Sequence, residues 1–250
     1  MKPILLFKQT HFSKTIWWKL KTNIPGYKSE LGLDLVTEIS RNRLFRLIES
    51  DLIRKNIEMK SRLLVQFYED GYICWVDIKS LVIERFDIQT NKINKSDAIN
   101  IQNKMPNVLN WIFLRSKQSN KYKWGGTLGP DFDCSGLIQT AFLKQNIFIP
   151  RDSFQMQIFC KHIFDSHINI NLLKMGDLLF FGNEKCNHVG IYLNNGCYYH
   201  CSGKDNGRDG IALDSLLNSN KSDSISKYYN SNLLSAGRVI RSYQWDKTIR

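Results

Sequence analysis

The spacing of apolar residues changes character partway along the chain. Up to about residue 86, short apolar runs are separated by turn residues, a pattern typical of β-strands. Residues 63–68 and 72–76 predict two strands joined by the turn Glu69-Asp70-Gly71, and residues 81–83 predict a third. The first part of the chain is therefore expected to be a small β domain.

The second part of the chain mixes helical periodicity with strands. Pro106 is expected to begin a helix, because proline is tolerated at the first helical position. A helix is expected at Cys134 and a shorter one over 153–161, followed by strands at 178–181, 187–193, 197–201 and 236–243. Residues 203–210 suggest a polar, glycine-rich loop, and the Ser/Asn/Lys-rich residues 218–232 suggest a mobile segment. The buried face of the first of these helices is expected to hold Val108, Leu109, Ile112 and Phe113.

These patterns divide the chain into four parts. Residues 1–24 show no steady period and are taken as an N-terminal extension. Residues 25–86 are expected to form a small SH3-like β-barrel, and the polar residues 87–105 a linker. Residues 106–250 are expected to form a domain of helices packed on an antiparallel sheet, so the predicted fold class is α+β.

Composition narrows the function only a little. The 250 residues carry a formal net charge of +12, but the basic residues are scattered and do not form a stripe that would indicate a nucleic-acid partner. The sequence shows neither an apolar run long enough for a membrane helix nor a secretory cleavage pattern. Together with six cysteines, this leads us to expect free thiols and a cytoplasmic location.

The strongest chemical signal is Asp131-Phe132-Asp133-Cys134-Ser135-Gly136. Apolar residues at helical spacing follow it, so Cys134 is expected at a helix N-terminus. There, the helix dipole and free backbone N–H groups are expected to lower the pKa of the thiol and to hold an oxyanion during acyl transfer. A single cysteine is more commonly buried and inert, so the argument for catalysis depends on the downstream histidines.

His188 and His200 lie on either side of a predicted hairpin, and the loop length decides whether they share a face. A three-residue loop, Asn194-Asn195-Gly196, would pair Leu193 with Cys197 and bring both histidines to one face. A two-residue loop would separate them. We predict the three-residue loop, with Cys134 as nucleophile, His188 as base and His200 as the residue that orients it.

Two alternatives concern the same histidines. Cys186, His188, His200 and Cys201 resemble a four-ligand zinc set in their spacing, but strand alternation points Cys201 away from His200. The other alternative is that each histidine is a structural residue. We favour the cysteine–histidine chemistry, which needs neither a metal nor a cofactor.

Several motifs in order resemble the NlpC-type, papain-like cell-wall cysteine peptidases. They are Tyr122-x-Trp124-Gly125-Gly126, Asp133-Cys134-Ser135-Gly136, Gly176-Asp177-Leu178-x-Phe180-Phe181, His188-Val189-Gly190-Ile191-Tyr192 and Tyr199-His200-x-Ser202-Gly203. The resemblance covers about residues 106–243. An SH3-like domain before the catalytic domain is similar to the γ-D-glutamyl-L-diamino-acid endopeptidases of that family.

The resemblance implies roles for particular residues. Cys134, His188 and His200 match the catalytic positions. Tyr122, Trp124, Asp133 and Ser135 match positions in the groove that holds the stem peptide, where Asp133 would suit a substrate ammonium. Tyr72 is similar to the tyrosine that the first domain points at the substrate's amino end, and Glu69 or Asp70 could assist it. Arg151 also matches a family position, but a salt bridge at a helix end explains it equally well.

The implied function is cleavage of the γ-D-Glu–diamino acid bond in peptidoglycan stem peptides with a free N-terminal L-Ala, through a thioester on the cysteine. The expected partner is a muropeptide of the L-Ala-γ-D-Glu-diaminopimelate type, handled during recycling, with no nucleic acid or membrane. Two alternatives stay open. One is a non-catalytic module that binds wall fragments, and the other is an amidase or acyltransferase with the same cysteine–histidine chemistry. The sequence leaves open the identity of the diamino acid, the oligomeric state, the origin of the positive charge and any role of Cys201, which replaces the usual small residue.

Overall fold

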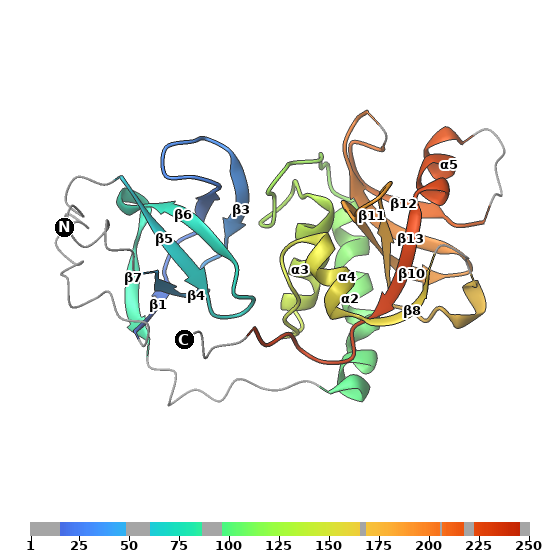
Figure 1. The fold of residues 1–250 in the computed structure, drawn as a ribbon, viewed down its shortest axis with the longest axis horizontal. Coiled ribbons are helices and arrows are strands. Elements are labelled where there is room, and N and C mark those ends of the chain that lie inside the picture. Colours follow the sequence, from blue (N-terminus) through green and yellow to red (C-terminus); the bar gives the residue numbers. More distant parts are fainter. Residues whose placement is uncertain are drawn as a thin grey trace. The chain divides into compact units, whose positions relative to one another are not determined.

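The computed structural model describes residues 16–48, 61–86, 97–165, 169–205, 207–217 and 223–245. These residues form two compact units (Figure 1). The described residues up to Phe86, together with Gln244 and Trp245, form the first unit, and those from Asp97 to Tyr243 form the second. Each unit has its own hydrophobic core.

The first unit is a seven-stranded antiparallel sheet. Its strand order is β3-β2-β6-β5-β4-β1-β7. The strands are β1 (Trp17–Leu20), β2 (Ile24–Tyr27), β3 (Leu35–Ile39), β4 (Leu44–Leu47), β5 (Arg62–Phe67), β6 (Ile73–Asp77) and β7 (Ile83–Phe86), with a 3-10 turn at Ile78–Ser80. The expectation of a β domain with a β5–β6 hairpin is confirmed.

Two details of the first unit differ from expectation. Among the described residues no pairing joins the outer strands β3 and β7, so the expected closed barrel is not found. Residues 16–24, which were assigned to an extension, instead contribute β1 and the start of β2 to the sheet. Three of the four β1 residues are buried. A short strand buried on both faces shows no alternation, which is why the sequence pattern missed it.

The chain returns to the first unit at its C-terminal end. Trp245 is buried, and its indole N–H donates to the Tyr68 carbonyl at 2.8 Å. The ring lies against Gly71, where a Cβ atom would come within 2.5 Å of it, and the Arg46 guanidinium lies 5.2 Å from its centre. Trp245, which falls within the expected catalytic range 106–250, therefore packs in the first unit.

The second unit packs helices against a six-stranded antiparallel sheet of order β12-β11-β10-β9-β13-β8. Its helices are α2 (Ala98–Ser116), α3 (Cys134–Leu143), α4 (Ser153–Phe159) and α5 (Ser224–Ser231), with a 3-10 turn at Ile170–Leu172. Its strands are β8 (Lys161–Asp165), β9 (Leu178–Phe181), β10 (His188–Asn194), β11 (Cys197–Ser202), β12 (Gly210–Ser215) and β13 (Leu233–Arg238). The α+β class predicted for this part is confirmed.

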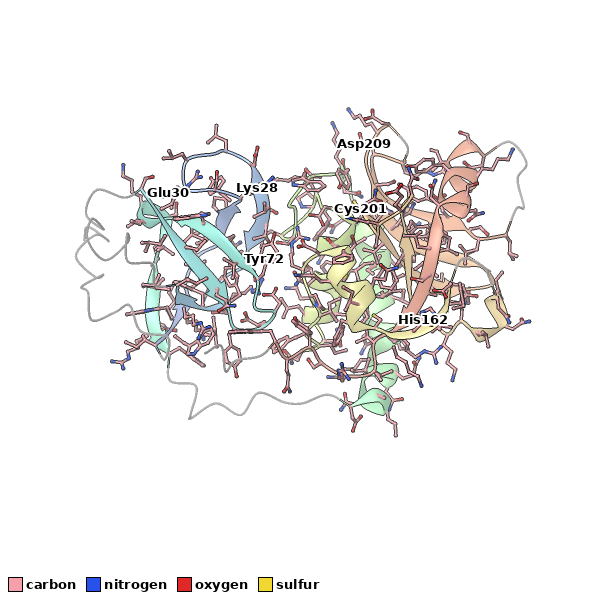
Figure 2. All side chains as sticks on the ribbon, in the orientation of Figure 1. Lys28, Glu30, Tyr72, His162, Cys201 and Asp209 are labelled. Atoms are coloured by element: carbon pink, nitrogen blue, oxygen red, sulfur yellow. The ribbon has the colours of Figure 1, made fainter. Side chains whose placement is uncertain are left out.

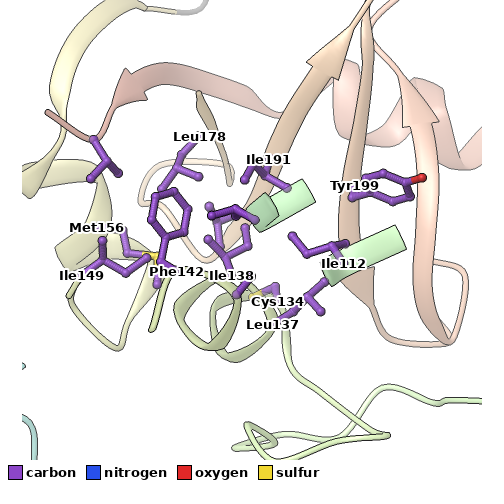
Figure 3. Packing of buried hydrophobic residues seen from close by; sticks show 14 of the residues in the cluster. Ile112, Cys134, Leu137, Ile138, Phe142, Ile149, Met156, Leu178, Ile191 and Tyr199 are labelled. Atoms are coloured by element: carbon purple, nitrogen blue, oxygen red, sulfur yellow. The ribbon is translucent and has the colours of Figure 1, made fainter. Parts of the chain in front are cut away.

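Two hydrophobic clusters use opposite faces of this sheet. Val189, Ile191 and Tyr199 belong to the cluster that includes α2 and α3, and Figure 3 shows Cys134 within it. Tyr192 and Tyr198 belong to the second cluster, together with Tyr229 of α5. The alternation of β10 and β11 thus separates residues packed under the α3 helix from residues packed under α5.

The first helix of the second unit begins earlier than expected. Asp97 caps it by accepting from the Asn100 N–H at 2.8 Å, and Pro106 lies inside it. The polar residues 98–104, assigned to the linker, are helical. They belong to the helix because Ile101 and Met105 continue its buried stripe toward the N-terminus. Phe113, expected in the core, is 41% exposed.

The segment 218–232 was expected to be mobile, but Ser224–Ser231 form helix α5. Asp223 begins this helix by accepting from the Ile225 and Ser226 N–H groups. The composition is polar because only one residue of the helix, Tyr229, is buried. A single buried side chain gives no periodic signal, so the helix was missed. The remaining residues of that segment before Asp223 lie outside the described ranges.

The β10–β11 hairpin reaches the predicted register by a different route. The turn has two residues, Asn195 and Gly196, both with positive φ, and Asn194 pairs with Cys197. A bulge between Tyr192 and Asn194 then shifts the register, so Gly190 pairs with His200. The three-residue loop was wrong, but the bulge adds the one residue that brings the histidines to one face.

Candidate active site

The two histidines are in direct contact. His188 Nε2 lies 2.8 Å from His200 Nδ1, and both side chains are buried. His188 begins β10, and His200 lies on the neighbouring strand β11. The diagonal contact predicted across this hairpin is therefore present.

A third residue, not predicted from the sequence, continues this chain of hydrogen bonds. Asp214 on β12 lies with Oδ2 2.8 Å from His200 Nε2, and it is buried. Its other oxygen accepts from Arg208 at 2.6 and 3.1 Å. Burial alone would raise the pKa of Asp214, but the hydrogen bonds from His200 and Arg208 outweigh it and hold the pKa below the usual range.

The network fixes the tautomers of both histidines. Asp214 is a carboxylate, so His200 Nε2 must carry a hydrogen. In the neutral imidazole, His200 Nδ1 then accepts, and the hydrogen between the rings belongs to His188 Nε2. That leaves Nδ1 of His188 without a hydrogen. The buried carboxylate therefore prepares His188 to take up a proton at Nδ1.

Cys134 is the first residue of helix α3, as predicted, and Asp133 is its N-cap. The α3 helix packs against β10, and the N–H groups of Val189 and Ser135 both reach the sulfur. Val189 follows His188 directly, so the thiol lies beside the strand that carries the histidine. Among the hydrogen bonds of the described residues, none joins Cys134 to either imidazole.

The pKa of the thiol moves opposite to the sequence-based expectation. Burial, followed by the Asp133 charge, raises the pKa of Cys134 to about 12, although the N–H groups of Val189 and Ser135 oppose this. Burial, and then His200, lower the pKa of His188 well below its ordinary value. The helix N-terminus does not outweigh desolvation here, so the resting pair is a neutral thiol and a neutral imidazole.

Asp133 has its oxygens committed to neighbouring groups. Oδ1 accepts from the Gly136 N–H at 2.6 Å and from the Ser135 hydroxyl at 3.1 Å, and Oδ2 accepts from the Gly125 N–H at 2.9 Å. Arg151 donates to both oxygens and to Ser135 Oγ. Asp133, Ser135 and Arg151 are all buried. These contacts position the start of α3, and a role of Asp133 in holding a substrate ammonium stays a prediction.

The loop before α3 is held close to the helix. At Gly136 an added Cβ would meet the Gly126 carbonyl oxygen at 2.1 Å, so only glycine allows this approach. Tyr122, on the same loop, is partly buried against the core, and Trp124 is 70% exposed. Burial, then the nearby Cys134, raise the pKa of Tyr122. This places Tyr122 near the thiol; direct substrate contact by either residue remains a prediction.

Tyr229 of α5 covers the histidine pair. Its ring lies 4.7 Å from the His188 ring and 4.6 Å from the His200 ring, centre to centre. Helix α5 is in turn anchored by Arg208, which donates to both Asp214 and Asp223. Neither Tyr229 nor Arg208 was singled out from the sequence, because each acts through residues on a different element.

Tyr72 lies in the first unit, at the end of the β5–β6 turn (Figure 2). It is half-buried, and its N–H donates to Asp70 Oδ1 at 3.0 Å. Asp70 and Glu69 both pair with the buried Arg43. These two carboxylates therefore already hold the hairpin turn in place, and the proposed substrate contact of Tyr72 stays a prediction.

The zinc candidates do not converge. Cys201 Sγ donates to the Phe132 carbonyl at 3.1 Å, and Cys186 Sγ donates to the His188 carbonyl at 3.5 Å. Within the ranges that the structure describes, no three His, Cys, Asp or Glu side chains are grouped to hold a metal ion. All six cysteines are free thiols. None of the described helices combines the length and apolar character that a bilayer crossing requires.

Comparison with curated proteins gives matches to parts of the chain. Over 113 residues the chain is 34% identical to the probable endopeptidase NlpC homolog of Haemophilus influenzae, covering 44% of this chain and 55% of that protein. Over 83 residues it is 36% identical to the γ-D-glutamyl-L-lysine dipeptidyl-peptidase of Bacillus subtilis, covering 32% and 26%. The match thus spans about half of the first relative and about a quarter of the second.

A crystal structure of an NlpC/P60 family protein from Bacillus cereus aligns with 94% of this chain and 67% of its own, at 20% identity and a TM-score of 0.45. The model of the NlpC/P60 family matches residues 119–237, which include Cys134, His188, His200 and Asp214. The second unit of this chain therefore contains a domain of the NlpC/P60 family of cell-wall peptidases.

Proposed function

We propose that the protein is a cysteine peptidase that cleaves peptidoglycan stem peptides at the bond between γ-D-Glu and the diamino acid. The observation that carries the proposal is the buried relay His188–His200–Asp214 beside Cys134 at the start of α3. Similarity to the γ-D-glutamyl-L-lysine dipeptidyl-peptidase supports the bond chosen.

The reaction follows from the tautomers. His188 Nδ1 takes the proton of the Cys134 thiol as the sulfur attacks the γ-carbonyl carbon of D-Glu. The positive charge that forms on His188 is shared with His200 and balanced by Asp214. His188 then returns the proton to the leaving nitrogen, and the diamino acid departs. Water, activated by the same imidazole, hydrolyses the thioester and restores the thiol.

Closing the contact between Cys134 and His188 is a step that this mechanism requires. A thiol with a pKa of about 12 is a poor nucleophile on its own. Proton transfer to a neutral imidazole during attack avoids a free thiolate, and catalytic hydrogen bonds commonly tighten only when substrate is bound. The reaction is therefore proposed to use general-base catalysis from a neutral pair.

The first unit is proposed to supply selectivity for a free N-terminal L-Ala, with Tyr72 at the amino end of the substrate in an SH3-like role. This rests on the resemblance of the domain order described above. A cytoplasmic role in muropeptide recycling is proposed on the same basis, and the six free thiols fit a reducing compartment. Cell fractionation with detection of the protein in the soluble cytoplasmic fraction tests the location.

The main experiment measures release of the diamino acid from L-Ala-γ-D-Glu-L-Lys and from its diaminopimelate counterpart. Cys134→Ala is expected to abolish turnover while the melting temperature stays within a few degrees of the parent. Cys197→Ala, which changes a thiol outside the site, serves as the control and should keep activity. Acetylation of the L-Ala amine is expected to slow cleavage strongly. Retained turnover by Cys134→Ala overturns the proposal, and equal rates on the acetylated peptide overturn the role of the first unit.

A second candidate is a module that binds wall fragments without cleaving them. The raised pKa of Cys134 favours it, because an unactivated thiol is what a non-catalytic site predicts. The rate of iodoacetamide alkylation, measured against pH with and without the peptide, separates the two. Alkylation that follows an ordinary or higher thiol pKa in both conditions, with tight peptide binding and no hydrolysis, selects the binding module. An acyltransferase would instead form new amides when amines are added.

A further inference from the structure

A cavity of about 200 Å³ lies between α5 and the loop that follows β11, with His188 in its wall. Its walls are aromatic and polar side chains together with the backbone of Gly182 and Gly203. Six of the lining residues are Phe181, His188, Lys204, Asp205, Tyr228 and Tyr229. The cavity has room for several water molecules, hence for one amino-acid side chain.

The position of His188 in the wall decides which part of a substrate the cavity faces. In peptide cleavage the general acid gives its proton to the leaving nitrogen, so the leaving group must lie against that imidazole. Gly203, another wall residue, lies near Tyr122, since an added Cβ there would lie 3.7 Å from the Tyr122 ring. Tyr122 belongs to the loop expected to hold the stem peptide. The cavity is thus placed for the group that departs.

The side chains in the cavity wall suit a small aliphatic molecule that carries a charge at each end. Phe181 and Tyr229 pack edge to face at 5.4 Å and, with Tyr228, give an apolar surface for an aliphatic stem. Lys204 and Asp205 contribute one charge of each sign. Lys204 lies 3.8 Å from Asp209, but the Lys204 side chain is 73% exposed, so this pair is weak and the ammonium is available to a ligand. Figure 2 shows Asp209 on this loop.

We propose that this cavity is the leaving-group subsite, and that it selects a diamino acid whose α-carboxylate pairs with Lys204 and whose side-chain ammonium pairs with Asp205. The inference rests on the proposed function, because it identifies the cavity by the bond that is cleaved. It adds what that proposal leaves open: which residues recognise the released amino acid. The aromatic walls contact the aliphatic part of the diamino acid, and Lys204 and Asp205 pair with its two charged groups.

The test compares substrates that differ only in the leaving group. L-Ala-γ-D-Glu is joined to L-lysine with a free carboxylate, to L-lysinamide, or to an arylamine that lacks both charges. Lys204→Met is expected to lower kcat/KM about tenfold for the lysine peptide, and to leave the lysinamide and arylamide substrates within twofold. Asp205→Asn is expected to affect both lysine-containing substrates and to spare the arylamide. Lys227→Gln removes a charge from α5 outside the cavity and is the matched control.

A second readout does not depend on turnover. Free L-lysine is expected to bind Cys134→Ala protein and to perturb the NMR signals of Tyr228 and Tyr229, and Lys204→Met should weaken this binding. Equal loss of kcat/KM on all three substrates, or no loss on any, overturns the subsite while leaving the peptidase proposal standing. Hydrolysis of none of the substrates by the parent protein overturns both.

Discussion

Two buried carboxylates lie in the candidate site, and they hold different kinds of partner. Asp133, on the Cys134 side, accepts from two backbone N–H groups, a hydroxyl and Arg151. Asp214, on the histidine side, accepts from an imidazole and Arg208. The described partners of Asp133 take no part in proton transfer, whereas His200 is hydrogen-bonded to His188, the proposed base. Asp133 therefore acts mainly on structure and Asp214 mainly on proton transfer.

The arginines differ in the same way. Arg151 is almost fully buried, whereas about a third of the Arg208 side chain is exposed. An ion pair inside the protein is costly to break on one side, because the remaining charge stays desolvated. Asp214 is buried as well, but Arg208 reaches the surface, so water can replace part of the interaction that its removal would take away. The comparison predicts losses of stability on the Asp133 side and losses of rate on the Asp214 side.

The largest expected effect is on stability, from Arg151→Met. This change leaves the Asp133 carboxylate buried without its cation and is expected to lower the free energy of unfolding of the second unit by about 3 kcal/mol. Equilibrium urea unfolding measures it. Arg208→Met, the matched change on the histidine side, is expected to cost less, because Arg208 is partly exposed and water can take its place beside Asp214. Similar losses for both variants would contradict the distinction between the two carboxylates.

The next effect is on catalysis, from Asp214→Asn. Arg208 requires an oxygen acceptor, so the amide of Asn would turn its NH₂ toward His200 Nε2. That reverses the hydrogens along the relay and puts one on His188 Nδ1, where the base must be free. We expect kcat to fall by roughly 100-fold, with little change in KM.

The double variant Asp214→Asn/Arg208→Met sharpens this prediction. Without Arg208, the amide can rotate and present its oxygen to His200, so part of the lost kcat should return. Steady-state kinetics on the three proteins gives the coupling between the two residues. A further loss in the double variant, in place of recovery, would argue that Asp214 acts only through packing.

Lowering the pH is expected to reduce folding stability through His188, on the Asp214 side, and not through the Asp133 side. Burial lowers the pKa of His188 below its ordinary 6.5, so the unfolded chain binds a proton that the folded chain resists. The stability present above pH 6.5 is therefore lost as the pH falls below that value, by up to about 1.4 kcal/mol per pH unit until the lower folded pKa is reached. Urea unfolding at several pH values measures the slope.

Single-residue variants identify the group whose protonation causes this dependence of stability on pH. His188→Gln is expected to flatten it, and His162→Gln, which changes an exposed histidine, should leave it unchanged. Arg151→Met should lower stability at every pH without altering the slope in this window, because it acts on the Asp133 side. The slope persisting in His188→Gln would locate the titrating group elsewhere.

The smallest expected effect comes from Tyr229, whose ring covers His188 and His200. Tyr229→Leu removes the ring that packs on both imidazoles and is expected to reduce kcat roughly two- to tenfold, the range that an aromatic contact contributes. Tyr229→Phe keeps the ring and should retain most of the rate on the uncharged arylamide substrate. If the two variants lose activity equally, the hydroxyl, and not the ring, matters.

The sequence by itself determined most of the elements and the reacting groups. The helix at Cys134, the strands at 178–181 and 197–201, and the shared face of His188 and His200 all follow from short-range apolar periods and turn residues. The helical face of α2 was also visible, although its start at Ala98 was hidden by polar residues. Local patterns carry this information because each depends on neighbours a few residues apart.

Only the tertiary structure decided what the reacting groups can do. Asp214, Arg208, Arg151 and Tyr229 come from separate elements and gain their roles by contact across the fold. The direction of the thiol pKa was also decided there, because burial depends on what packs over Cys134. Helix position favours a thiolate and desolvation opposes it, and the balance depends on the packing of chain segments far apart in the sequence.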